Sequence, residues 1–140
     1  MHIKIKKLHP EAKLPKYALP GDVGMDLFSL EEKIINPGEH LFVMHGFALE
    51  FPTGYAAIVM DKSSISKAGL KTMGGVFDAG FRGEYNTHLV NLSDTPYIIE
   101  KGAKVSQLVI LPVEIAQLEE VQELSESERG EGRFGSTGKF

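Results

Sequence analysis

Short stretches in which apolar and polar residues alternate recur along the whole chain, and no other feature of the sequence constrains the fold as strongly. Successive side chains of a strand point to opposite faces, so this alternation is typical of half-buried strands. Turn residues such as Pro20-Gly21 and Pro37-Gly38 separate the stretches. The pattern predicts an all-β sandwich or barrel. The expected strands cover residues 2–6, 26–29, 33–35, 40–51, 55–60, 84–92, 97–100 and 104–111.

A single segment, residues 62–69, has helical character, with Ser63 or Ser64 as its N-cap and Gly69 as its end. Because tight turns rather than helices join the strands, we do not expect a doubly wound nucleotide-binding fold. A chain of 140 residues is long enough for one core. We expect a β-barrel domain over residues 1–124. A mobile C-terminal arm should follow over residues 125–140, where closely spaced glycines disfavour a fixed conformation.

Composition excludes several classes of protein. The chain has no cysteine, which excludes disulfides, thiolate metal sites and a cysteine nucleophile, and is consistent with a reducing cytoplasm. Nineteen acidic residues against fifteen basic ones give a net charge of −4, so we expect no general attraction to nucleic acid. No apolar stretch is long enough to span a membrane. We therefore expect a soluble, cytoplasmic chain, in which any site for an anion is basic only locally.

Two segments of the middle of the chain could carry chemistry. Residues 74–84 combine apolar residues, an acid and a glycine-containing turn, which predicts a β-hairpin whose tip brings Asp78 close to Phe81. The alternative is an aspartate favoured only by the turn. Residues 61–67 place hydroxyls and an amine at the expected helix start, where free backbone amides favour anions. The alternative there is an ordinary capped turn.

Asp26 enters an expected strand and is better placed than Asp22 to face a site, although either could simply be a turn residue. Covalent catalysis is not expected, because the chain has no Gly-x-Ser-x-Gly segment and no histidine beside a suitable serine. Any hydrolysis should therefore use an activated water. The five histidines form no pair with the spacing of zinc ligands.

The C-terminal segment matches a dinucleotide-binding fingerprint in its letters alone, since no strand precedes it and no helix can follow. Its glycine-rich backbone beside Arg129, Arg133, Ser136 and Thr137 could nevertheless cradle phosphate oxygens. Phe134 could stack on a base. The alternative is a solubilising tail without a binding role.

Taken in order, five segments resemble the motifs of the homotrimeric deoxyuridine triphosphatases (dUTPases), over residues 21–138. The first two are similar to Gly-x-Asp-Leu and Arg-Ser-Ser-Leu, and the third to Gly-Val-Ile-Asp-x-x-Tyr-Arg-Gly-Glu. The fourth and fifth are similar to Gly-Asp-Arg-Ile-Ala-Gln-Leu and Arg-Gly-x-Gly-Gly-Phe-Gly-Ser-Thr-Gly. The segments are Gly24-Met25-Asp26-Leu27, Lys62-Ser63-Ser64-Ile65, and residues 75–84, 101–108 and 129–138.

The resemblance implies a distorted, jelly-roll-like β-barrel that hydrolyses dUTP to dUMP and pyrophosphate. Asp78 would activate the water that attacks the α-phosphorus, and Asp26 would meet Mg²⁺ through a coordinated water. The activity would limit uracil incorporation into DNA and supply dUMP for dTMP synthesis. Each site of a homotrimer would draw on three subunits, with neither nucleic acid nor membrane as a partner.

The resemblance also implies which residues bind the substrate. The backbone at Gly75 and Val76 would read the edge of uracil, and Phe81 would lie against the deoxyribose. Arg129 would clamp the terminal phosphates, and Phe134 would cover the uracil as the arm closes. The implied substrate-binding residues are Lys62, Ser63, Ser64, Gly75, Val76, Phe81, Gln107, Arg129, Phe134, Gly135 and Ser136.

Four positions depart from the family motifs. Lys62 stands in place of an arginine, which loses bidentate geometry. Phe81 stands in place of a tyrosine, Asp61 where a proline is common, and Arg133 in place of a glycine. These changes bear on rate and affinity more than on the class of enzyme.

Two other functions remain open from the sequence. A dCTP deaminase of the same superfamily would carry a catalytic glutamate ten residues after the hairpin aspartate, where this chain has His88. A relative that binds dUTP for regulation would order its tail on nucleotide binding without releasing pyrophosphate.

Overall fold

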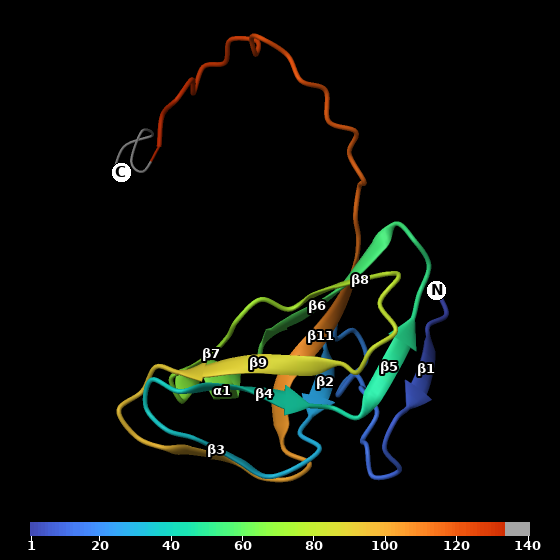
Figure 1. Ribbon diagram of the computed structural model, residues 1–140, viewed down its shortest axis with the longest axis vertical. Helices are drawn as coiled ribbons and strands as arrows, with labels where there is room; N and C mark the ends of the chain where they lie inside the picture. Colours follow the sequence, from blue (N-terminus) through green and yellow to red (C-terminus); the bar gives the residue numbers. More distant parts are fainter. Residues whose placement is uncertain (134–140) are drawn as a thin grey trace.

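The computed structural model describes residues 1–133, which form an antiparallel β-structure with one short helix (Figure 1). The predicted all-β fold is therefore confirmed. The elements are β1 (Lys4–Lys7), β2 (Met25–Phe28), β3 (Lys33–Ile35), β4 (His40–Met44), β5 (Phe47–Glu50), β6 (Tyr55–Asp61), α1 (Ser63–Lys67), β7 (Leu70–Thr72), β8 (Val76–Asp78), β9 (Asn86–Asn91), β10 (Tyr97–Ile99) and β11 (Lys104–Pro112).

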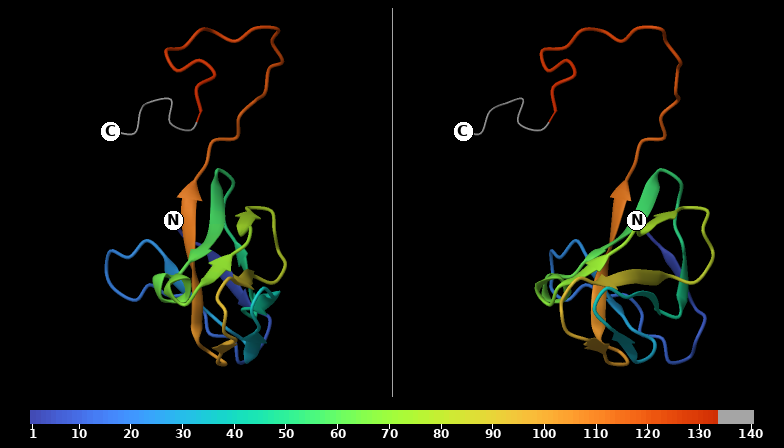
Figure 2. Two further views of the ribbon diagram at one scale, coloured as in Figure 1. Left: turned by 90° about the vertical axis from the view of Figure 1, so that its left-hand side faces the viewer. Right: turned by 60° about the vertical axis from the view of Figure 1, so that its left-hand side comes forward.

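The strands form four sheets, all with antiparallel pairing. The largest has the order β2-β11-β6-β8, a second has the order β4-β9-β7, and the pairs β1-β5 and β10-β3 complete the barrel. β11 is the longest strand and runs through the body of the molecule (Figure 2). Because it pairs with β2 on one side and β6 on the other, β11 brings together segments far apart in the sequence.

Two clusters of buried side chains make up the core. The first packs β2, β5 and β6 against Tyr85 and Leu108, and aromatic rings contribute much of it. The second fills the space around β3, β4, β9 and α1. Their fully buried members include Leu27, Phe47, Tyr85 and Leu108 in the first, and Ile35, Val43, Leu89 and Val105 in the second.

A chain of buried polar groups connects the sheets at His45. Its Nδ1 lies 2.8 Å from the carbonyl oxygen of Phe28, which can only accept, so Nδ1 carries the proton of the neutral ring. Nε2 then accepts from the Thr87 hydroxyl at 2.8 Å, and the Thr87 oxygen accepts from the Ser106 hydroxyl at 2.6 Å. Each buried group thus has a partner, which offsets the cost of taking it out of water.

Several local predictions need correction. The strand expected over residues 40–51 is two strands, because the chain bends at Gly46, whose φ of 74° favours glycine. β7 was not among the predicted strands. Neither serine caps α1; Lys62 is the N-cap residue and makes no side-chain cap. Gly69 follows the helix at φ 87°, as expected.

The predicted hairpin is correct in its turn and wrong in its pairing. The Phe81 amide donates to the Asp78 carbonyl at 3.0 Å, so the chain turns there and brings these two residues close. β8, however, pairs with β6, with Asp78 opposite Ala56, while β9 pairs with β4 and β7. The two strands flanking the turn therefore belong to different sheets.

Two histidines that lie far apart in the sequence meet on the outer face of β4 and β9. His40 Nδ1 is 2.9 Å from His88 Nε2, and the ring of Phe42 stacks on His88 with centroids 4.2 Å apart. Sequence spacing could not show this pair, because the strands lie next to each other only through long-range pairing.

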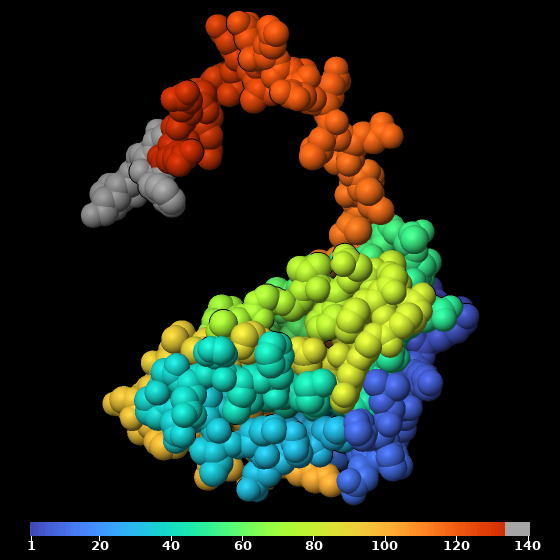
Figure 3. Space-filling model, viewed as in Figure 1, coloured from blue at the N-terminus to red at the C-terminus, as the bar shows by residue number. Residues whose placement is uncertain are grey.

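Residues 113–133 follow β11 as an exposed segment that extends away from the barrel (Figure 3). The segment is strongly acidic up to Glu128 and contains neither strand nor helix within its described residues. Within residues 1–133, no helix has the length and apolar character needed to cross a membrane.

We predict that the fold loses stability between pH 7 and pH 5 because of His45. Burial lowers the pKa of His45 from 6.5 to about 4, although the Phe28 carbonyl opposes the shift. Below pH 6.5 the unfolded chain protonates this histidine, whereas the folded chain keeps it neutral until about pH 4. The free energy of unfolding should therefore fall by roughly 2 kcal/mol by pH 5.

Urea denaturation of the wild type, His45→Gln and His2→Gln at pH 7, 6 and 5 measures this effect. The exposed His2 should be replaceable without a change in the pH dependence, whereas His45→Gln should flatten it. Equal pH dependence in the wild type and His45→Gln would contradict the assignment.

Candidate active site

Asp26 forms the centre of the first group of predicted site residues. It is 5% exposed on β2, and both carboxylate oxygens are held by ammonium groups. Lys62 Nζ lies 2.8 Å from Oδ1, and Lys104 Nζ lies 2.6 Å from Oδ2. We call Asp26, Lys62, Lys104 and the neighbouring Gln107 the Asp26 cluster.

The electrostatics of the Asp26 cluster suit an anion. Burial alone would raise the pKa of Asp26, but the hydrogen bonds and charges of Lys104 and Lys62 outweigh it and lower the pKa. Asp26 therefore stays ionised at neutral pH. Two ammonium groups against one carboxylate leave one positive charge over, and both lysine side chains remain partly exposed. Such a group can bind phosphate oxygens through charge-assisted hydrogen bonds.

Gln107 is held from two sides. Its Nε2 donates to the carbonyl oxygen of Asp61 at 2.9 Å. On the other side lies Gly24, where an added Cβ would come within 2.1 Å of Gln107 Oε1. Glycine at position 24 therefore leaves the space that the amide occupies. Ser63 and Ser64 are exposed at the start of α1, directly after Lys62.

The second group of predicted residues surrounds Asp78. Gly75 has φ 109°, and an added Cβ would lie 2.8 Å from the carbonyl oxygen of Val59, so only glycine fits this close approach. The Gly75 carbonyl accepts the Val59 amide at 2.8 Å, which fixes the entry to β8. Val76 and Asp78 are both exposed along this short strand.

Phe81 rests on a small aromatic stack. Its ring lies 5.4 Å from Phe77 and 5.8 Å from Tyr85, while Phe77 and Tyr85 stack with centroids 4.3 Å apart. Burial raises the pKa of Tyr85 to about 12. Gly83 makes room for Phe81, because an added Cβ would meet the ring at 2.5 Å. The exposed part of Phe81 thus forms a rigid apolar surface beside Asp78.

The two groups lie at opposite ends of β6. Asp78 pairs with Ala56 near the start of the strand, whereas Asp61 at its end pairs with Ser106, next to Gln107. These positions are five residues apart, which is roughly 17 Å along a strand. One protomer therefore does not bring Asp78 to the Asp26 cluster.

The remaining predicted residues are in the C-terminal segment. Arg129 is exposed, and its carbonyl accepts the Gly132 amide at 3.0 Å in a turn beyond the barrel. Phe134, Gly135 and Ser136 lie outside the residues that the structure describes.

Comparison with known families decides the class of the chain. The family model described as dUTPase matches residues 10–138, which is most of the chain. The chain belongs to the dUTPase family. The resemblance inferred from the five motifs is thereby confirmed at the level of the family.

Individual relatives agree with this assignment. The deoxyuridine 5'-triphosphate nucleotidohydrolase of Clostridium tetani is 46% identical over 140 residues, which cover 98% of this chain and 97% of the relative. That of Clostridioides difficile is 41% identical, covering 98% of both chains. The dUTPase of Staphylococcus bacteriophage 80alpha, solved with dUpNHpp, superposes with a TM-score of 0.92 at 30% identity, covering 98% of each chain.

Lys104 contacts Asp26, and it is the main residue of the site that the sequence analysis missed. Period-two alternation places residues 104 and 107 on opposite faces of a strand. A β-bulge between Lys104 and Ser106 shifts the register, so that Lys104 pairs with Phe28 while Gln107 pairs with Asp26. Lys104 thus joins Gln107 on the face of Asp26. A buried aspartate needs a partner of opposite charge, and this requirement was the signal that could have led to Lys104.

The described residues restrict how this dUTPase could hold magnesium. Within residues 1–133, no three histidine, aspartate or glutamate side chains gather as metal ligands. Both oxygens of Asp26 bind ammonium groups, although an ionised carboxylate has about four acceptor sites and can still accept from water. The site therefore fits a Mg²⁺ ion that is held mainly by phosphates and water, with Asp26 in contact through a coordinated water.

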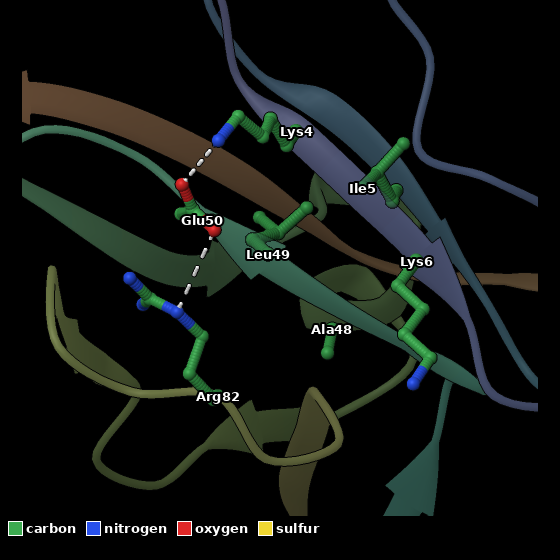
Figure 4. Close-up of a pocket in the computed structure, with 7 residues that line it drawn as sticks. All are labelled: Lys4, Ile5, Lys6, Ala48, Leu49, Glu50 and Arg82. Carbon is green, nitrogen blue, oxygen red and sulfur yellow. Dashed lines mark hydrogen bonds and ion pairs between the residues drawn. The ribbon is translucent and has the colours of Figure 1, made fainter.

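A hollow of about 390 Å³ lies between β1, β5 and Arg82 (Figure 4). The carboxylate of Glu50 forms ion pairs on two sides of the hollow. Its Oε1 lies 2.6 Å from Lys4 Nζ, and its Oε2 lies 4.0 Å from Arg82 Nε. None of its lining residues belongs to the predicted substrate-binding set. The hollow adjoins the Asp78 turn only through Arg82, the residue after Phe81.

We predict that Asp26→Asn destabilises the protein by about 1–3 kcal/mol, because Lys62 and Lys104 would lose their shared counter-charge. Urea denaturation at pH 7 measures the change, with the exposed Asp94→Asn as a matched control that should stay within about 0.5 kcal/mol of wild type. An Asp26→Asn variant as stable as wild type would mean that the cluster is not held by this charge.

Proposed function

We propose that the protein is a dUTP nucleotidohydrolase in which Asp78 activates the attacking water. The water oxygen bonds to the α-phosphorus while Asp78 takes its proton, and the bond from the α-phosphorus to the bridging oxygen breaks, releasing dUMP and pyrophosphate. A positioned carboxylate base contributes about 10²- to 10⁴-fold. The observation that carries this proposal is the exposed Asp78 carboxylate between the Gly75–Val76 backbone and the Phe81 ring, in a chain of the dUTPase family.

The Asp26 cluster would bind the triphosphate. Lys62 and Gln107, with the exposed hydroxyls of Ser63 and Ser64, offer donors for its oxygens on the side with the positive charge left over. Neutralising and aligning the phosphates supplies the larger part of catalysis in reactions of this kind. When bound, Mg²⁺ supplies further charge neutralisation, and Asp26 would hold it through a coordinated water.

Selectivity would come from the segment around Asp78. The backbone of Gly75 and Val76 would hydrogen-bond the edge of uracil, and cytosine would leave these groups unpaired. The firmly packed Phe81 would lie against the deoxyribose and leave no room for a 2′-hydroxyl. Phe134 would cover the base, with Gly135 and Ser136 completing the contacts from the C-terminal arm.

We propose a homotrimer with three shared sites. The separation of roughly 17 Å along β6, between Ala56 opposite Asp78 and Asp61 at the end of the strand near the Asp26 cluster, supports this arrangement, because a neighbouring subunit can supply the missing half. One subunit would give the Asp26 cluster, a second the Asp78 turn, and a third the arm over residues 125–140, where Arg129 would clamp the terminal phosphates. Closure of the arm would exclude water.

In the cell, hydrolysis of dUTP would limit uracil incorporation into DNA and supply dUMP for dTMP synthesis. We place this activity in the cytoplasm, since a chain without cysteine needs no oxidising compartment.

We predict that Asp78→Asn lowers kcat for dUTP by at least about 100-fold, because an amide cannot take the proton from water. Affinity for the imido analogue dUpNHpp should stay within about threefold, since the amide keeps the size of the carboxylate. Pyrophosphate release and calorimetric titration measure the two quantities, with Asp94→Asn as the control. Undiminished turnover in Asp78→Asn would refute the assignment of the base, and a wild type that binds dUpNHpp without hydrolysing dUTP would refute the enzyme function.

A further inference from the structure

Asp61 connects the two larger sheets of the barrel. It ends β6 in the sheet β2-β11-β6-β8, and its side chain reaches β7 in the sheet β4-β9-β7. Its Oδ1 accepts from both the amide and the hydroxyl of Thr72, each at 2.7 Å. Its Oδ2 pairs with the ammonium group of Lys71. One carboxylate thus makes three contacts with two consecutive residues of β7.

These contacts close the loop between β6 and β7 at both ends. The loop, residues 62–69, contains α1 and the three residues Lys62, Ser63 and Ser64 of the expected phosphate-binding set. The main chain of Asp61 also holds a fourth residue of the expected phosphate-binding set, Gln107, because the Asp61 carbonyl oxygen accepts a hydrogen bond from Gln107 Nε2 at 2.9 Å. Fixing Asp61 therefore fixes the start of the loop and the amide of Gln107 together.

The negative charge of Asp61 is compensated within the same group of residues. Burial opposes ionisation, but the hydrogen bonds from Lys71 and Thr72 outweigh it and hold the pKa of Asp61 below its usual value. The carboxylate is thus ionised and paired, so its charge adds little repulsion towards a nearby phosphate. A proline is common at this position of the family motif and stiffens the main chain through its ring. In this chain a side-chain clamp can have the same effect.

We propose that Asp61 is a positioning residue for the triphosphate, which clamps the loop over residues 62–69 so that Lys62, Ser63, Ser64 and Gln107 keep their places. This inference rests on the proposed function. It requires that loss of the clamp weakens contacts with the phosphates and leaves contacts with the nucleoside unchanged, because Gly75, Val76 and Phe81 are held by other partners.

The test compares two inhibitors of dUTP hydrolysis in the full-length protein: dUpNHpp, which carries the triphosphate, and deoxyuridine, which carries none. Asp61→Ala should raise the Ki of dUpNHpp by about tenfold or more, in line with the loss of hydrogen bonds to a charged group. The Ki of deoxyuridine should stay within about twofold. A purely structural role would move both constants equally or neither.

Conservative variants separate the clamp from the ion pair. Asp61→Asn keeps an Oδ1 that accepts from Thr72 and should restore the Ki of dUpNHpp to within about threefold of wild type. Lys71→Gln removes the exposed ammonium group and should likewise have little effect. Thr72→Val removes one of the two hydrogen bonds from Thr72 and should give a loss smaller than that of Asp61→Ala, which keeps the test valid if Asp61→Ala does not fold.

Unchanged dUpNHpp inhibition in Asp61→Ala, or an equal loss for both inhibitors, would overturn the positioning role while leaving the enzyme function in place. Unchanged dUpNHpp inhibition in Thr72→Val, should Asp61→Ala not fold, would overturn it as well. A wild-type protein that neither hydrolyses dUTP nor binds dUpNHpp would overturn both this inference and the proposed function.

Discussion

The register of β6 with its two neighbours is the constraint on which the site depends. On one side β8 places Asp78 opposite Ala56, and on the other β11 places Gln107 beside the end of the strand at Asp61. Because β6 is an extended strand that separates these two positions, one chain does not bring the expected base to the expected phosphate contacts. In the proposed trimer, activity then depends on assembly of the subunits, and any change that weakens assembly should also weaken catalysis.

The two halves differ in how they are prepared for a ligand. The Asp26 cluster is held in place before any nucleotide arrives, since Asp26 orients Lys62 and Lys104 and the space left by Gly24 accommodates Gln107. Donors fixed in this way need little reorganisation when charge develops on the phosphates. The Asp78 turn is exposed on one side and packed on the other, where Phe77 and Tyr85 stack. In the proposed trimer, a neighbouring subunit would place its Asp26 cluster beside this exposed surface.

Local patterns predicted the strands, the turn at Asp78–Phe81 and the end of α1 at Gly69, because each depends on residues close in sequence. They could not predict the pairing of β8 with β6 or the bend at Gly46, which depend on packing between distant segments. Lys104 was missed for a related reason, since the bulge before Ser106 inverts the face that alternation assigns to it. The expected roles of the other site residues came from the family motifs, whereas the contact of Lys104 with Asp26 and the clamp at Asp61 came from the structure.

Mixing of two variants, each altered in a different half of the proposed site, tests the shared site most directly. Asp78→Asn and Gln107→Ala would each be purified, mixed in equal amounts, unfolded and refolded together, and assayed for pyrophosphate release from dUTP. If each site takes Asp78 and Gln107 from different subunits, random assembly should restore about one quarter of wild-type activity, because each contributor is intact with a chance of about one half. Activity no higher than that of the separately refolded variants would contradict a site shared between subunits.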